Sequence, residues 1–535
     1  MPAPLLAPVT ARIRTRPLAF ALISLVVAAG LGGCLHRPDH GPASTRAPSA
    51  APQPAAPADP FAADEARAEA PVETAAVAGA PPVLIQHATV LTASGHRYSP
   101  GFVLLEGGVI AAVGEGDGPA ATRPGTTVID ARGKFVTPGI IDPHSHMGVY
   151  PEPESQGHDD GNELTDPITA GLRAEHSFWP QDPALERAVA GGVTTIAALP
   201  GSGNLIGGRG VTLHLAPQRG ARAMRFPGAP EILKMACGEN PKRVYGDMKR
   251  APSTRMGNVR AVREAFIRAQ KYARDWDDWT RKQREPNQQG SKQDRGDGGD
   301  TRSGDDKSPD RDLALETLAL VMRGDILVEW HCYQADDMLA ALEVADEFGF
   351  KVRAFHHALE AYKIRDVLAQ RGVGVVTWDD WWGFKMEAYD GIPENLALVT
   401  EAGGRAIVHS DSPIWGQLLN QSAGKALAAG RAAGVKLDDD DALRWLTANP
   451  AWALGIDGQV GTLEPGKRAD VVVWSDSPFS TYAKAELVYV DGGLIFDRAH
   501  VGAPRSDFEL GVRAMPARPP AGASTPAGAS RGEGQ

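Results

Sequence analysis

The stretch TPGIIDPHSHMGV, residues 137–149, decides the fold that we expect for this chain. An apolar run that begins at a Pro-Gly turn leads directly into His144 and His146. Side chains at positions i and i+2 of a strand lie on the same face, so both imidazoles can reach one metal ion. The pair alone is weak evidence, because short histidine pairs also arise by chance in surface loops.

Around this stretch, over residues 138–455, short apolar runs alternate with helical patterns. The expected strands are VTTIAAL, EILKMAC, DILVEWHC, KVRAFHHA, GVGVVTWDD and GRAIVHSD, and DDMLAALEVADEFG and DDALRWLTANPAWALG are expected helices. Repeated strand-helix units favour a parallel sheet. Roughly eight units in this length fit an α/β fold, a (β/α)8 TIM-type barrel with its site at the C-terminal strand ends. An open doubly wound sheet is the alternative, but no G-x-G-x-x-G opens a helix after the first strand.

Strand patterns rich in branched residues lie on both sides of this region. PVLIQHATVLTA and GFVLLEGGVIAAVG precede it, GTLEPGKRADVVVWS and AELVYVDGGLIFD follow it, and EGG and DGG mark tight turns. Each piece alone is short for a stable β-domain. We therefore expect residues 83–137 and 456–514 to form one small composite β-sandwich domain, with two independent caps as the alternative.

The N-terminal segment, residues 1–34, has the pattern of a targeting signal. Arginines precede the apolar run PLAFALISLVVAAGLGG, which ends at Cys34 within LGGC and is shorter than the ~20 residues that span a bilayer. It resembles a bacterial lipoprotein signal, which implies lipidation of Cys34 and an exported, periplasmic or cell-envelope protein held at the membrane by its lipid alone. The residue after the cysteine is Leu35 and not aspartate, which by analogy with such lipoproteins favours the outer membrane. An uncleaved anchor helix and an ordinary secretory signal are the alternatives.

Three further segments cannot bury enough apolar surface to fold and are predicted to be disordered. They are an Ala/Pro-rich tether at 35–82, a polar Gly-rich insertion at 280–312 and a tail at 515–535. One remaining cysteine pair, Cys237 and Cys332, cannot make a disulfide-rich scaffold, and a bridge between the two is left open. The formal net charge of -11 offers no basic surface, so we do not expect nucleic-acid binding.

Further metal-type residues recur at predicted strand ends. His331 closes DILVEWHC, His357 lies in VRAFHHA and Asp411 closes RAIVHSD. Each alone has an ordinary interpretation as a buried, hydrogen-bonded histidine or a helix-capping aspartate. Together, at the C-terminal ends of successive strands, they favour a metal site. Lys234, in EILKMACGENPKR, cannot bind a cation as an ammonium, but its carbamate offers two oxygens; a lysine paired with Glu239 is the equal alternative.

The chain resembles the metal-dependent amidohydrolase superfamily, particularly its imidazolonepropionase-like and prolidase-like members. The resemblance covers roughly residues 83–498 and rests on TPGIIDPHSHMG, GENPKR, HCYQADD, HHALEA, VHSDSP, TANPAWALGID and GTLEPGKRADVVVW, in the family's order. It implies a first metal held by His144, His146 and Asp411, a second held by His331 and His357, and a carboxylated Lys234 that bridges the two.

Two further histidines need a choice. His356 and His357 are adjacent, so on a regular strand they point to opposite faces and only one can reach the site. We choose His357, because HALEA matches the family's pattern after that residue. His409 shares a face with Asp411 one layer deeper, and we leave it as a partner of a metal ligand.

The resemblance implies a hydrolase that cleaves a carbon-nitrogen bond in an amide, a lactam or a peptide. A metal-activated hydroxide would attack the carbonyl, and Asp411 would act as general base and then general acid. We expect one or two divalent metals per chain, Zn2+ for preference, although Mn2+ and Fe2+ also suit these ligands. The imidazolonepropionase subgroup is understood to use one metal and no carbamate. The alternatives are a one-metal deaminase of the same superfamily and a catalytically inactive barrel that acts as a scaffold.

Substrate-binding residues are harder to predict. The aromatic segment VVTWDDWWGFKMEAYDG makes Trp381 and Trp382 candidates to wall a pocket, or else to pack the loop onto the barrel. Arg243 and Arg255 are candidates to bind a substrate carboxylate, and the Gly-rich loop at 201–210 could approach a ligand. The expected partner is a small-molecule or peptide-like substrate, and a homo-oligomer is expected by analogy with relatives.

Overall fold

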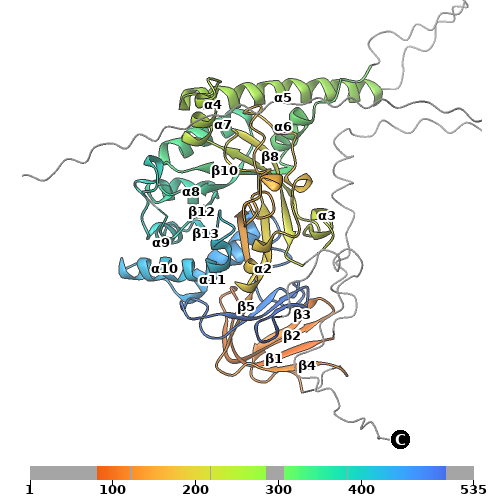
Figure 1. Ribbon diagram of the computed structural model, residues 1–535, viewed down its shortest axis with the longest axis vertical. Helices are drawn as coiled ribbons and strands as arrows, with labels where there is room; N and C mark the ends of the chain where they lie inside the picture. Colours follow the sequence, from red (N-terminus) through yellow and green to blue (C-terminus); the bar gives the residue numbers. More distant parts are fainter. Residues whose placement is uncertain (1–80, 121–122, 217, 285–306, 382, 502–535) are drawn as a thin grey trace, which may run out of the picture. The chain divides into compact units, whose positions relative to one another are not determined.

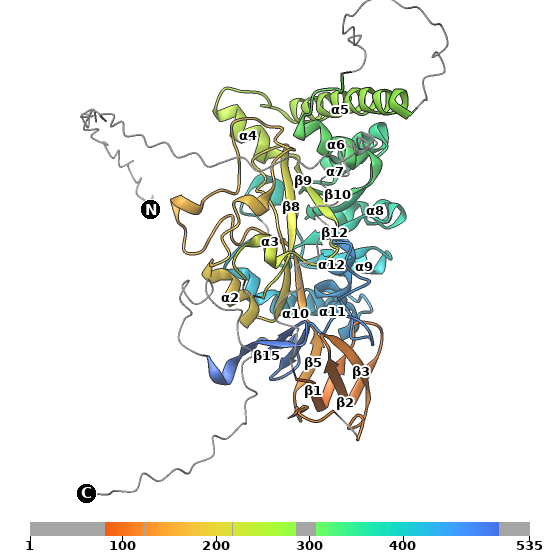
Figure 2. The same cartoon turned by 90° about the vertical axis from the view of Figure 1, so that its right-hand side faces the viewer.

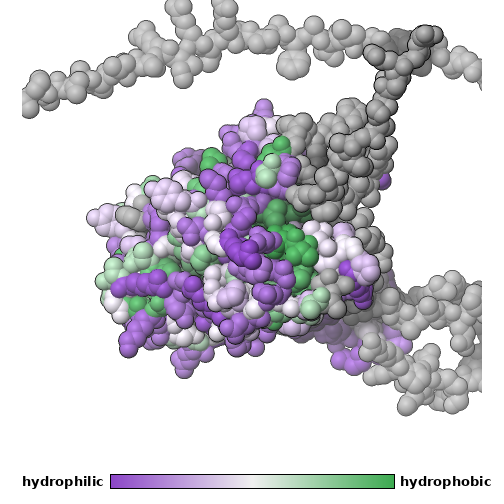
Figure 3. All heavy atoms as spheres, turned by 90° about the horizontal axis from the view of Figure 1, so that it is seen from below, coloured by the Kyte–Doolittle hydropathy of each residue, from purple (hydrophilic) through white to green (hydrophobic). Residues whose placement is uncertain are grey.

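The computed structural model describes residues 81–120, 123–216, 218–284, 307–381 and 383–501 (Figure 1). The predictions for the signal peptide with Cys34, for nearly all of the tether, for the 515–535 tail and for Trp382 lie outside these ranges. Within them, no helix combines the length and the apolar character needed to cross a membrane. Figure 3 shows one face of the molecule, on which hydrophilic residues predominate and hydrophobic residues gather in small patches between them.

The barrel is an eight-stranded, nearly closed sheet in the order β13-β12-β11-β10-β9-β8-β7-β6. Its strands are β6 (Ile140–Ser145), β7 (Val193–Ala198), β8 (Ile206–His214), β9 (Glu231–Ala236), β10 (Ile326–Cys332), β11 (Val352–His357), β12 (Gly374–Thr377) and β13 (Arg405–Val408). β6 pairs parallel with β7, and β9 to β13 pair parallel throughout. The α/β class and an eight-stranded barrel sheet are therefore confirmed.

Strand β8 departs from the parallel sheet that we expected. It runs antiparallel to both β7 and β9, and residues 206–210 of the predicted Gly-rich loop lie inside it. The chain reverses between β7 and β8 within residues 199–205, and a connection this short joins antiparallel strands because parallel ones need a longer crossover. The expectation of a uniformly parallel barrel was wrong at this strand.

Helices cover the barrel sheet, with α6 to α9 along one side of it (Figure 2). The α-helices are α2 (Pro183–Ala190), α3 (Ala221–Met224), α4 (Glu239–Asp247), α5 (Arg255–Arg284), α6 (Leu313–Arg323), α7 (Ala335–Phe348), α8 (Arg365–Arg371), α9 (Asn395–Glu401), α10 (Leu419–Ala432), α11 (Asp439–Leu446) and α12 (Ala448–Ala453). Short 3-10 turns occur at η1 (Gln156–His158), η2 (Ala174–His176), η4 (Ala361–Ile364), η5 (Met386–Ala388), η6 (Trp415–Leu418) and η7 (Arg498–His500).

Helix α5 corrects one predicted boundary. It continues to Arg284, so residues 280–284 of the predicted disordered insertion are helical. Buried Phe266, Ala269 and Trp276 lie on one face at helical spacing and pack into the barrel core, which holds the helix as far as Trp276. Residues 285–306 of the insertion lie outside the described ranges.

Strands from both ends of the described chain share a second sheet. They are β1 (Val83–Leu91), β2 (Arg97–Glu106), β3 (Val109–Glu115), β4 (Thr127–Asp130), β5 (Phe135–Pro138), β14 (Val471–Trp474), β15 (Ala485–Val490) and β16 (Gly493–Asp497). The order is β16-β15-β14-β5-β1-β2-β3, with β4 paired to β1. The antiparallel pairing of β5 with β14 joins the two chain segments. A sandwich of two sheets stays a prediction.

Trp474 fixes this second sheet against the barrel. Its indole is 1% exposed and belongs to the same core as Leu185 and Val189 of α2. Its Nε1–H donates to Thr137 Oγ1 at 2.9 Å. At Gly192, where φ is +91°, a Cβ would lie 2.8 Å from the indole ring, so the backbone there approaches the ring more closely than any larger residue allows.

We predict that Trp474→Ala lowers the free energy of unfolding by about 3–5 kcal/mol, because it empties a packed site between the sheet and the barrel. Urea unfolding followed by circular dichroism measures the change. Trp415→Ala is the matched control, since that indole is 44% exposed and its loss should cost about 0.5 kcal/mol or less. Equal losses in the two variants would contradict the packing described here.

Candidate metal centre

Eight ionisable side chains converge where the barrel strands end. They are His144 from β6, His146 just after β6, Lys234 from β9, His331 from β10, His356 and His357 from β11, and His409 and Asp411 after β13. All are buried except Asp411, whose side chain is 22% exposed. The structure thus brings all six ligands predicted from the sequence into one cluster.

The first group of ligand atoms is the one predicted for the first metal. His144 Nε2 lies 3.2 Å from Asp411 Oδ1 and 3.3 Å from His146 Nε2, and His146 Nε2 lies 3.1 Å from Asp411 Oδ1. His146 Nδ1–H donates to the carbonyl oxygen of Leu199 at 2.8 Å, because a carbonyl can only accept. The lone pair of His146 is therefore on Nε2, which faces the other two atoms, as in a metal ligand held by a backbone carbonyl.

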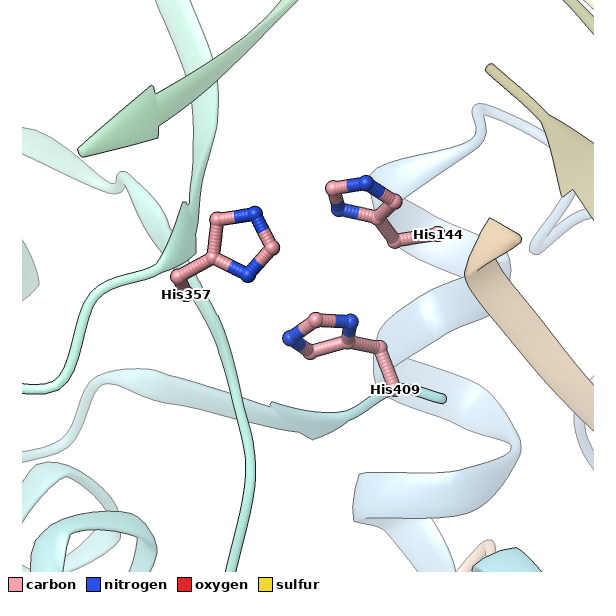
Figure 4. A group of neighbouring side chains, drawn as sticks. All are labelled: His144, His357 and His409. Carbon is pink, nitrogen blue, oxygen red and sulfur yellow. The ribbon is translucent and has the colours of Figure 1, made fainter. Parts of the chain in front are cut away.

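A second group joins His144 to His357 and His409, whose rings face a shared space (Figure 4). His357 Nδ1 and both ring nitrogens of His409 are buried, and nothing in the described part of the chain hydrogen-bonds to them. Buried polar atoms left unpaired cost about 1–3 kcal/mol each, so their presence needs an explanation. Imidazole and carboxylate groups suit a divalent transition metal, and a cation would satisfy these atoms.

Burial keeps the imidazoles neutral. It lowers the pKa of His144, His331 and His357 well below 6.5, with further lowering by nearby cationic groups, and it lowers the pKa of His409 to about 3. A neutral imidazole carries the lone pair that a metal ion needs, so these rings are ready to bind a cation at neutral pH.

Lys234 lies at the centre of the cluster and is fully buried. Its Nζ donates to the carbonyl oxygen of Pro200 at 3.1 Å and lies 3.2 Å from His144 Nε2. Burial lowers its pKa to about 8, although the charges of Asp411 and Glu329 oppose the shift. Pairing with Glu239, the alternative weighed from the sequence, is not the contact that the structure shows.

Asp142 joins the first barrel strand to the segment that follows the last. Its carboxylate accepts hydrogen bonds from Ser410 Oγ at 2.5 Å, from the Ser410 amide at 3.2 Å and from the His144 amide at 3.3 Å. Burial raises its pKa to about 7, and the bonds from Ser410 oppose that shift. Beside it, the Asp411 amide donates to the carbonyl oxygen of His144 at 3.0 Å. Asp411 has φ +53°, a left-handed conformation that aspartate tolerates better than most residues.

The premise that His356 and His357 point to opposite faces was wrong, although of the two only His357 contributes an atom to a group of candidate ligand atoms. His356 Nδ1 lies 2.7 Å from His144 Nδ1, and the ring centroid of His357 lies 4.8 Å from that of His144. The strand ends here, because His357 and Ala358 have φ values of +68° and +37°. Strict alternation fails where the backbone leaves the extended region, so both rings turn toward His144.

The ligand set predicted from the sequence for the second metal is found only in part. His357 joins a ligand group with His144 and His409, whereas His331 is placed beside it, with ring centroids 4.2 Å apart. His331 Nε2 is also buried without a hydrogen-bond partner among the described residues, and its Nδ1 lies 2.6 Å from Ser202 Oγ. His409, left from the sequence as a partner of a ligand, is thus itself a candidate ligand.

The residues predicted to bind substrate lie in different surroundings. Trp381 stacks on Trp378 at 5.1 Å, and Trp378 stacks on His357 at 4.6 Å, so a pair of stacked indoles lies against the cluster. Arg255 forms ion pairs with Asp336 and Asp337, and the substrate role predicted for it stays a prediction. Arg243 is exposed on α4, and its role stays a prediction.

Sequence reasoning missed two features of this cluster and left a third open. Asp142 stands two residues before His144, and Glu329 two residues before His331, so strand alternation could have placed both on the faces of those ligands. The Cys237–Cys332 disulfide joins the ends of β9 and β10 beside His331, and the sequence had left this pair open.

Comparison with known proteins identifies the family of this chain. Residues 353–496 match the amidohydrolase family. The crystal structure of an amidohydrolase from Thermotoga maritima MSB8 is 35% identical with a TM-score of 0.68, and the match covers 78% of this chain and 100% of that one. The amidohydrolase tasK of Hapsidospora irregularis is 34% identical over 441 residues, 78% of this chain but 42% of tasK. An imidazolonepropionase of Geobacillus thermodenitrificans is 59% identical over 54 residues, 9% of this chain and 12% of that enzyme.

The chain is an α/β-barrel protein with a histidine-rich candidate metal centre, and it belongs to the amidohydrolase family. It spans less than half the length of tasK and a small part of the imidazolonepropionase.

We predict that Ser410→Ala destabilises the metal-free protein more at pH 8 than at pH 5.5. The pKa of Asp142 is about 7, so the group is mainly a carboxylate at pH 8 and mainly an acid at pH 5.5. Hydrogen bonds to a charged group contribute about 1.5–3 kcal/mol and those to a neutral one about 0.5–1.5 kcal/mol. Urea unfolding of chelator-treated protein at both pH values measures the difference, with Ser412→Ala as the neighbouring control. An equal loss at the two pH values would contradict the charge assigned to Asp142.

Proposed function

We propose that this protein is a metal-dependent hydrolase of a carbon-nitrogen bond in an amide, a lactam or a peptide. The observation that carries the proposal is the convergence of His144 Nε2, His146 Nε2 and Asp411 Oδ1 within 3.3 Å of one another at the C-terminal edge of the barrel sheet. Membership of the amidohydrolase family supports the reaction class.

In this proposal His144, His146 and Asp411 hold a divalent metal, with Zn2+ preferred. When bound, such a metal activates water near neutral pH and polarises a carbonyl group. Asp411 Oδ1 lies 3.2 Å from His144 Nε2 and 3.1 Å from His146 Nε2. Oδ2 then serves as the general base that accepts a proton from the attacking water, and afterwards as the general acid that passes the proton to the leaving nitrogen.

A second metal is part of the proposal, with His331, His357 and a carboxylated Lys234 as its ligands. Two observations support it. The pKa of Lys234 is lowered to about 8, so an appreciable fraction of the amine is neutral near pH 7, and the neutral form is the one that reacts with CO2. Buried nitrogens of His331 and His357 lack partners in the described chain. The one-metal deaminase remains the alternative, and His409 in place of Lys234 would fit it.

The aromatic side chains beside the cluster support a substrate with an apolar group. Trp378 is buried against His357, and Trp381 stacks on Trp378. Phe384, next to both indoles, is 55% exposed. Rings in this order can bind an apolar side chain of a small-molecule or peptide-like substrate and leave its carbonyl at the ligand cluster. An inactive scaffold is disfavoured, because every predicted ligand is present.

Export as a lipoprotein through Cys34 and assembly into a homo-oligomer stay part of this proposal. They rest on the sequence pattern and on analogy.

We predict that Asp411→Asn lowers turnover by about 10²–10⁴-fold, because the amide of asparagine cannot accept and return the proton. The zinc-loaded protein is screened against dipeptides, lactams and cyclic imides, and the variant is assayed on the best substrate. Metal content is measured by mass spectrometry and should persist in the variant, since asparagine keeps an oxygen at Oδ1.

Asp325→Asn, an exposed carboxylate after α6, is the matched control and should keep full turnover. Unchanged turnover in Asp411→Asn would contradict the proton-transfer role. A metal content of one equivalent with and without bicarbonate would refute the second metal, and release of ammonia from aminated heterocycles would favour the deaminase.

A further inference from the structure

Two buried side chains next to the candidate metal centre have no part in the proposed reaction. Glu329 of β10 and His356 of β11 are both 0% exposed. They are bonded to each other between Glu329 Oε2 and His356 Nε2, and the other ring nitrogen of His356 contacts His144. Burying a carboxyl group beside an imidazole costs several kcal/mol of solvation, so this pair needs a reason.

The direction of the hydrogen bonds follows from the role proposed for His144. Its Nε2 lies 3.3 Å from His146 Nε2 and 3.2 Å from Asp411 Oδ1, the other two candidate ligand atoms. A metal held by these three atoms needs the lone pair of His144 on Nε2, so the single proton of this neutral ring is on Nδ1. His144 Nδ1–H then donates to His356 Nδ1 at 2.7 Å.

The same logic continues to Glu329. His356 Nδ1 accepts, so the proton of that ring is on Nε2 and is donated to Glu329 Oε2. An oxygen of the Glu329 carboxyl group can accept this bond in either protonation state. Both nitrogens of His356 are thus used, which explains why His356 is in neither group of candidate ligand atoms.

The opposite direction does not suit a metal ligand. If Glu329 donated to His356, and His356 to His144, the proton of His144 would be on Nε2. That N–H would point at the position of the proposed metal and leave no lone pair there.

We propose that Glu329 and His356 are positioning residues that hold His144 in the tautomer whose Nε2 lone pair faces the metal. The inference rests on the proposed function, because it assigns a purpose to the lone pair of a proposed ligand. The structure supplies a three-residue chain, Glu329 to His356 to His144, that ends where His146 and Asp411 meet it.

The test compares zinc affinity in two variants of Glu329, by competition with a chromophoric chelator. Glu329→Leu removes the acceptor and should weaken zinc binding about 10–100-fold, the effect typical of losing a partner behind a metal ligand. Glu329→Gln keeps an acceptor oxygen of nearly the same shape and should keep affinity within about 3-fold, well under the loss expected for leucine. Glu316→Leu is the control. It removes another buried glutamate, which lies on α6 and is bonded to Arg311, and it should bind zinc like the parent protein.

A second readout holds even if the leucine variant fails to fold. Nitrogen NMR of histidine-labelled, metal-free protein, with His144 assigned by a His144→Asn difference spectrum, should show His144 protonated on Nδ1 in the parent and the glutamine variant. Protonation on Nε2 would overturn the proposal, as would equal zinc affinity in the folded leucine variant and the parent, or equal weakening in the leucine and glutamine variants. Failure of the parent protein to bind zinc at all would instead refute the proposed function.

Discussion

The buried carboxylate of Asp142 ties the first strand of the barrel to the segment that follows the last strand. Its bonds to Ser410, 268 residues away in the chain, and the amide bond from Asp411 to His144 join the two ends of the barrel sheet. His144 belongs to the first strand and Asp411 to the segment after the last strand. Because these hydrogen bonds hold both residues, the distance between their ligand atoms is set by the closure of the barrel and not by a flexible loop.

Desolvation explains why the histidines of the cluster are ready to bind a metal ion. Burial lowers the pKa of the imidazoles around Lys234, so each ring is neutral and keeps one nitrogen lone pair. Several of these nitrogens lack hydrogen-bond partners in the described chain, and His357 and Asp411 hold left-handed backbone conformations that are unfavourable for most residues. Backbone strain and unpaired polar atoms in one place are typical of functional sites, where the fold must over-determine them. A cation that binds there would offset part of this cost.

The chemistry of the site could be predicted from the sequence better than its geometry. Candidate ligands stand at the ends of apolar runs, and a parallel sheet brings such ends to one edge, so His144, His331 and Asp411 could be placed together. Alternation failed at His357, because a positive φ cannot be foreseen from the residue itself. The antiparallel strand β8 was hidden by its glycines, which resemble a loop. The partners Asp142 and Glu329 were overlooked because buried carboxylates look like strand-end residues until their contacts are known.

The central claim is that His144, His146 and Asp411 share one metal ion. Anomalous X-ray diffraction at the zinc edge, on crystals of the zinc-loaded protein, tests it most directly. The account predicts an anomalous peak bonded to His144 Nε2, His146 Nε2 and Asp411 Oδ1. Fully loaded crystals with no peak at these three atoms, or with zinc bound only elsewhere, would contradict it.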